Sequence, residues 1–202
     1  MISYRIDQQN LMVSDRVFRP ENPSRLSAEW PDPLGYNQPA EALRCMHREL
    51  LGFVREHRPT GGLLLNAMES KRYRIAEYFG LGTSESIEDM TMDLRWFAQQ
   101  AESIASSRAT FIAIFDDVSI CDEDDFEHQL WSQIIGMLNI DSMANAMTAF
   151  TDATPDDEQT LLGIGGHDFR VVTLHPYASE SRHRFAYPTL VLSRSPVLSQ
   201  AC

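Results

Sequence analysis

The feature that most constrains the fold is a pair of apolar runs joined by a glycine-rich turn near the C-terminal end of the chain. The runs cover residues 161–164 and 169–174, and the second is rich in the β-branched and aromatic residues that suit strands. Residues 165–168 begin with two glycines, which adopt positive φ without steric cost, so this segment predicts a tight turn. A third run over residues 187–192 predicts another strand. We therefore expect a β-hairpin followed by a third strand.

The preceding part of the chain has the pattern of amphipathic helices, in which apolar residues recur at three- and four-residue intervals. Between the helices, residues 110–115 form a short, largely apolar run, which predicts a buried strand. Residues 63–79 are ambiguous because their centre is polar. The predicted helices cover residues 39–57, 87–104, 126–138 and 141–150. Residues 83–86 supply the N-cap candidates of the second helix, and Ser86 with Asp89 resembles a capping pair.

This order of elements predicts an α+β fold, in which helices back a mainly antiparallel sheet. Residues 1–37 contain four prolines and few periodic apolar positions, so we expect an irregular N-terminal arm lying on a single domain of residues 38–202. The sequence has no GxGxxG, P-loop or GxSxG motif, so nothing supports a nucleotide-binding or α/β-hydrolase fold.

Composition and charge exclude several classes of function. The hydrophobic content of 43% and the charged content of 23% are those of a soluble globular protein, and no apolar run reaches the length of a membrane span. A net charge of −12 argues against binding to nucleic acids or anionic membranes. Three cysteines without paired spacing (Cys45, Cys121 and Cys202) argue against disulfides and CxxC sites. Since residues 1–16 lack the apolar core of a secretory signal, we expect a cytoplasmic protein.

His175 is the strongest candidate for a site residue, because it follows a predicted strand and precedes a proline. A hydrogen-bonded core histidine is the alternative interpretation. No HxH or HExxH spacing accompanies it, so a site with several protein ligands is hard to assemble. Haem needs one axial ligand, an apolar slot and cations for its two propionates, and Arg182 and Arg184 follow closely. The alternative interpretation of the two arginines is that they are exposed loop residues on an acidic protein.

Several segments together carry a specific pattern: residues 80–97, 110–117, 126–131 and Gly165-Gly166…Leu174-His175-Pro176…Arg184-Phe185…Tyr187-Pro188. These segments resemble the YqcI/YcgG family, and the likeness covers roughly residues 50–193. Several members are haem enzymes of natural-product pathways that use O2 to oxidise a nitrogen of an amino acid, such as the guanidine of arginine or the amine of lysine. The resemblance implies a haem-dependent N-oxygenase with His175 as axial iron ligand and a separate electron donor. It also makes Glu85 a candidate partner of a cationic amino-acid substrate. The alternative interpretation is that Glu85 only places negative charge at a helix N-terminus.

The chain departs from the family pattern at three places. The family's Pro-Cys segment corresponds to residues 58–62, which contain no cysteine. Glu180 and His183 stand where the family has arginines, which removes fixed positive charge from the loop. Two alternatives therefore stay open: a haem carrier without oxygenase activity, and a family member without cofactor that binds a partner protein.

Overall fold

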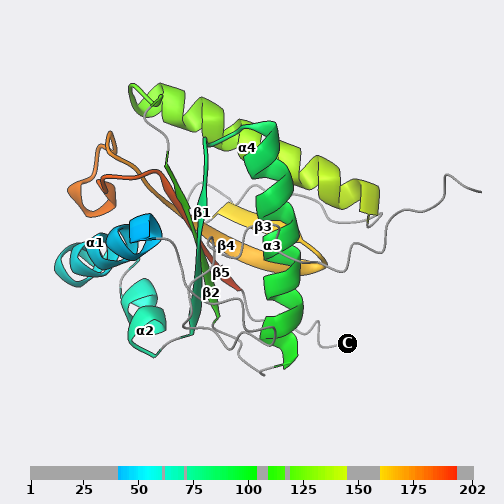
Figure 1. Ribbon diagram of the computed structural model, residues 1–202, viewed down its shortest axis with the longest axis horizontal. Helices are drawn as coiled ribbons and strands as arrows, with labels where there is room; N and C mark the ends of the chain where they lie inside the picture. The colour runs from blue at the N-terminus through cyan, green and yellow to red at the C-terminus, as the bar shows by residue number, and fades with distance from the viewer. Residues whose placement is uncertain are drawn as a thin grey trace, which may run out of the picture.

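The computed structural model describes residues 41–60, 62–70, 72–103, 109–116, 119–144 and 160–194. These residues form one α+β domain with a mainly antiparallel five-stranded sheet, which confirms the predicted fold class. The sheet stands between two pairs of helices (Figure 1). The predicted N-terminal arm, residues 1–37, lies outside the described residues.

The strands lie in the order β1-β2-β5-β4-β3 across the sheet. β1 and β2 are parallel and are joined through the helix α3, whereas β2–β5, β5–β4 and β4–β3 are antiparallel pairs. The pairing of β3 with β4 ends at Thr160 and Val171. Within the described part of the chain, the C-terminal end of β4 therefore extends past β3. The strands are β1 (Tyr73–Tyr78), β2 (Thr110–Phe115), β3 (Thr160–Ile164), β4 (His167–Leu174) and β5 (Thr189–Arg194).

The helices cover both faces of the central strands. α1 and α2 pack on one face and α3 and α4 on the other (Figure 1). Because side chains alternate along a strand, β2 serves both layers: Ile112 and Ile114 face α1 and α2, and Phe111 belongs to the core under α3 and α4. This explains why residues 110–115 read as a continuous apolar run. The helices are α1 (Glu41–His57), α2 (Leu63–Glu69), α3 (Ser84–Ser103) and α4 (Glu123–Ala144).

The C-terminal hairpin is confirmed, with a tighter turn than expected. Gly165 and Gly166 alone form the turn, with φ values of 62° and 78°, and His167 is already paired with Ile164. Positive φ at both central residues gives the twist that two antiparallel strands need, and glycine adopts it without strain.

Two local predictions were wrong, and one strand lies in the segment that was left ambiguous. Ser86 does not begin α3: the helix starts at Ser84, and the hydroxyl of Thr83 accepts a hydrogen bond from the Ser86 N–H (3.2 Å), so Thr83 is the cap. No helix boundary occurs at Asp141, which lies inside α4; residues 145–150 of the predicted second helix lie outside the described residues. The strand β1 was not predicted, because Arg74 and Glu77 interrupt its apolar pattern. Arg74 is buried nonetheless, and its guanidinium lies 4.7 Å from the centre of the Trp96 ring.

Candidate functional site

A cleft of about 670 Å³ lies beside the C-terminal half of β4. Its walls come from the N-terminal half of α4, the segment before α2, the strand β4 and the loop that follows β4. The α4 wall is largely apolar, with Phe126, Leu130 and Ile134, and Trp131 stands at its exposed side. This volume is within the range of small-molecule and cofactor sites, which is roughly 300–1,000 Å³.

His175 forms part of the cleft wall immediately after β4. His175 as a whole is only 5% exposed. Its ring is stacked on that of Phe126, with the ring centroids 3.9 Å apart and the planes 8° from parallel. Its Nδ1 is shielded from solvent and has no hydrogen-bond partner among the described residues. Burial lowers the pKa of His175, although the charge of Glu123 acts in the opposite direction. The site therefore favours a neutral imidazole.

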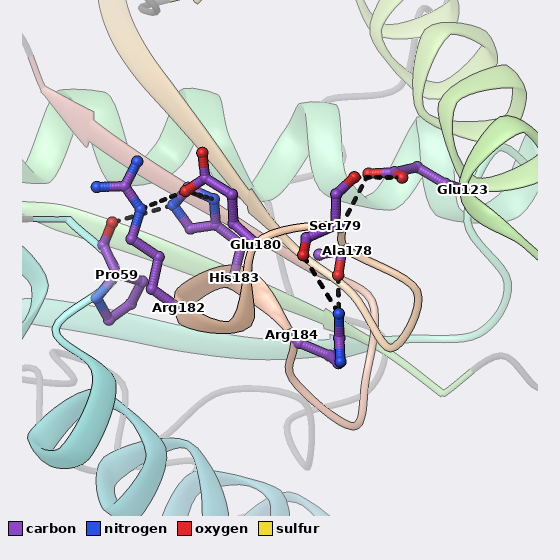
Figure 2. Close-up of polar contacts among 8 residues, drawn as sticks. All are labelled: Pro59, Glu123, Ala178, Ser179, Glu180, Arg182, His183 and Arg184. Carbon is purple, nitrogen blue, oxygen red and sulfur yellow. Dashed lines mark hydrogen bonds and ion pairs between the residues drawn. The ribbon is translucent and has the colours of Figure 1, made fainter.

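The loop after β4 closes on the segment before α2 through His183. This residue lies in the short 3₁₀ turn Ser181–His183, and its Nε2 is 3.1 Å from the carbonyl oxygen of Pro59. Because a carbonyl oxygen only accepts hydrogen bonds, Nε2 must be the protonated nitrogen that donates this one. The Nδ1 atom of His183 lies 3.8 Å from Glu180, whose carboxylate also accepts a hydrogen bond from Nε of Arg182 (Figure 2). That bond lowers the pKa of Glu180.

Two further contacts fix the same loop. Ser179 donates from its hydroxyl and its backbone N–H to the carboxylate of Glu123, at 2.6 and 3.2 Å, and these bonds lower the pKa of Glu123. Arg184 donates to the carbonyl oxygens of Ala178 and Ser179 at 3.0 and 3.2 Å. Figure 2 shows Arg184 turned toward the loop backbone, well apart from the group of Pro59, His183 and Glu180. The loop is thus anchored to α4 at one end and to Pro59 at the other.

The structure brings together some of the residues predicted from the sequence and separates others. His175 and Arg182 line the cleft, whereas Arg184 does not and serves to hold the loop. Glu85 is exposed in the first turn of α3 and lies outside the cleft lining. Its position suits an acidic residue at a helix N-terminus.

Sequence reasoning missed three residues of the cleft: Phe126, Glu127 and Arg170. Phe126 was predicted only as a packing residue of its helix. Arg170 carries a signal in hindsight, because it is the one charged residue in the run 169–174, where strand alternation places it on the opposite face from Phe169.

No group of three or more His, Cys, Asp or Glu side chains in the described ranges could hold a metal ion. None of the helices that the structure describes has the length and hydropathy to cross a membrane.

Comparison with known proteins identifies the family. No curated protein and no solved structure matches the chain. The model of the YqcI/YcgG family matches residues 65–201, which contain β1 to β5, α3, α4 and the loop with His175. The chain therefore belongs to the YqcI/YcgG family.

Proposed function

We propose that the protein is a haem-dependent oxygenase that uses O2 to hydroxylate or oxidise a nitrogen of an amino acid, either the guanidine of arginine or an amine. Electrons come from a separate donor. The proposal rests on family membership together with the environment of His175. We place the enzyme in the cytoplasm, because Cys45 and Cys121 are exposed free thiols, which suit a reducing compartment.

The observation that carries the proposal is an imidazole on the wall of a cleft whose Nδ1 is buried and has no hydrogen-bond partner among the described residues. Most metal-ligating histidines use one nitrogen for the metal and the other for a hydrogen bond or water. His175 departs from this pattern at Nδ1, and we assign the iron to Nε2. The lowered pKa of His175 supports ligation, since only neutral imidazole binds a metal. The stacked Phe126 ring holds the imidazole in one orientation.

The residues of the chain fit a haem in part. His175 would hold the haem iron, and the apolar side chains of Leu130 and Ile134 would help to exclude water from the site. Arg182 would be a cation for one propionate, although its Nε donates to Glu180. Haem, when bound, supplies the redox chemistry with O2, and the protein positions the substrate nitrogen. The role of Glu85 in substrate binding stays a prediction from the family resemblance.

An absorption spectrum tests the cofactor. The purified protein titrated with haem should show a Soret band, and His175→Ala should abolish it or shift its position. His128→Ala is the matched control, because His128 is exposed on α4 and lies outside the cleft lining. Consumption of O2 with arginine or lysine and a reductant then tests the enzyme activity. A Soret band that is the same in His175→Ala and in the wild type would refute the ligand assignment.

A second candidate function is that of a family member without oxygenase activity, either a haem carrier or a cofactor-free protein that binds a partner. One observation favours it: Glu180 pairs with Arg182 at the cleft, so the charge of that arginine is partly neutralised. The same experiments separate the candidates. A carrier gives the Soret band without consumption of O2 above the haem-only background, and a cofactor-free protein gives neither.

A further inference from the structure

The backbone of His175 is held on both sides by hydrogen bonds of the loop that follows β4. Its N–H donates to the carbonyl oxygen of His183 at 3.1 Å, and its carbonyl oxygen accepts from the N–H of Ala178 at 3.3 Å. Arg184 closes the loop by donating to the carbonyl oxygens of Ala178 and Ser179. The position of the imidazole therefore depends on where this loop sits relative to α4.

A carboxylate of α4 holds the loop on the same side of the helix that carries the stacking ring. Glu123 accepts hydrogen bonds from the hydroxyl and the N–H of Ser179 at 2.6 and 3.2 Å, and Figure 2 shows it reaching Ser179 from α4. Phe126, whose ring stacks on His175, lies three residues further along α4, and residues three apart are neighbours on a helix surface. The first turn of α4 thus contacts the loop at Ser179 and its iron-ligand candidate at His175.

These contacts form a closed circuit. It runs from the His175 ring through Phe126 to Glu123, across to Ser179, and along the loop backbone through Ala178 to the carbonyl oxygen of His175. The other anchor of the loop, the hydrogen bond from His183, ties it to the segment before α2 rather than to α4. The bonds of Glu123 therefore set the loop, and with it the imidazole, relative to the Phe126 ring.

We propose that Glu123 is a positioning residue for His175, which keeps the imidazole stacked on Phe126 by holding Ser179 against α4. The consequence for catalysis rests on the proposed function. Residues that orient a metal-binding histidine without touching the metal typically change the affinity or activity by about 10–100-fold. Because the carboxylate acts through hydrogen bonds, Glu123→Gln should replace it in large part, since the amide oxygen still accepts from the Ser179 N–H.

The first test is proton NMR of the histidine rings in the full-length protein without haem. An aromatic ring shifts the protons of a group stacked on its face upfield, so the His175 signals, identified by their loss in His175→Gln, report the stacking directly. Glu123→Ala should lose most of this upfield shift, and Glu123→Gln should keep most of it. Asp124→Ala is the matched control, because it removes an exposed acid from the same turn of α4 and outside the cleft lining.

Signals elsewhere separate a local displacement from a general loss of structure. The rings of His47 on α1 and His167 at the start of β4 lie outside the cleft lining, and their signals should not move in any of these variants. The inference is overturned if the His175 signals of the wild type show no upfield shift, or if Glu123→Ala keeps as much of that shift as Asp124→Ala does.

A double-mutant cycle shows whether Glu123 acts through Ser179. Ser179→Ala removes the hydroxyl donor and should lose part of the upfield shift of His175. Glu123→Ala should then change the shift less in the Ser179→Ala background than in the wild type, because both variants break the same contact. Equal changes in the two backgrounds would mean that Glu123 does not act through this loop, which contradicts the inference.

Haem titration measures the consequence for the proposed function. Glu123→Ala should weaken haem binding about tenfold, whereas Asp124→Ala should change it less than about threefold. If the wild type binds haem through His175 but these two variants bind it equally well, the positioning role is refuted and the haem site stands. If Glu123→Ala loses the upfield shift in a protein that gives no Soret band, Glu123 still positions the imidazole and the haem oxygenase is refuted.

Discussion

Removing one partner of the ion pair between Asp141 and Arg95 should strongly destabilise the protein, because it leaves the other charge buried without compensation. Asp141 lies near the end of α4, and its side chain is 3% exposed. It accepts a hydrogen bond from Nε of Arg95 at 2.7 Å, and both of its carboxylate oxygens lie 3.2 Å from the N–H of Gly165. The residue therefore ties α4 and α3 to the turn of the β3–β4 hairpin. Since α4 and β4 are also two walls of the cleft, this contact helps to fix the site.

The expected magnitude follows from what Asp141→Ala would leave behind. Removing one partner of a buried ion pair costs about 3–5 kcal/mol, and the 24% exposure of the Arg95 side chain places this pair at the lower end. Arg95 keeps a hydrogen bond to the carbonyl oxygen of Ile140, which also limits the loss. The Gly165 N–H loses its acceptor, which adds about 1 kcal/mol. We expect a total loss of about 3–4 kcal/mol in the free energy of unfolding.

Urea denaturation measures this change, and a double-mutant cycle isolates the pair. Asp141→Asn keeps an acceptor for Gly165 and should cost less than Asp141→Ala. Arg95→Met combined with Asp141→Ala should cost at least about 1 kcal/mol less than the sum of the single changes, because the two groups interact directly. Asp168→Ala, an exposed acid in the same hairpin, is the control and should stay within about 0.5 kcal/mol of the wild type. The reasoning fails if Asp141→Ala is as mild as Asp168→Ala, or if the cycle is additive.

Two other predictions concern a helix glycine and the titration of His175. Gly52→Ala should raise the free energy of unfolding by about 0.5–1 kcal/mol, because Gly52 is exposed inside α1 and an added Cβ would meet no atom within 4 Å. Thermal unfolding measures the change. Gly136→Ala in α4 is the control and should give no such gain, because its Cβ would lie 2.6 Å from Ile87. Because burial lowers the pKa of His175 in the folded protein, only the unfolded chain takes up its proton as the pH falls below about 6.5. The wild type should therefore lose stability relative to His175→Gln between about pH 7 and pH 5, by at most about 1.4 kcal/mol per pH unit. Parallel pH profiles of the two proteins in urea titrations would contradict the burial argument.

Most of the fold could be predicted wherever a single periodicity dominated the sequence. The stripe of apolar residues in α3, the all-apolar strand β2 and the two glycines of the hairpin turn each allow one local structure, and each was found. The apolar periodicity did not predict β1, because the strand contains the charged residue Arg74. Arg74 is buried against Trp96, which belongs to the helix α3. A contact of that kind leaves no trace in local periodicity.

In the candidate site, too, local sequence determined some features and contacts between elements determined the others. Local sequence alone determined that His175 would stand at the end of a strand, since Pro176 cannot extend the ladder. Only the tertiary structure decided that Arg184 holds the loop backbone while Arg182 reaches the cleft, although a single residue separates them in sequence. It likewise brought Phe126 onto the His175 ring and set Glu127 and Arg170 in one cleft, from a helix and a strand more than forty residues apart in the chain. The physical reason is that periodicity encodes which face of an element is apolar, whereas partners between elements depend on how the faces pack.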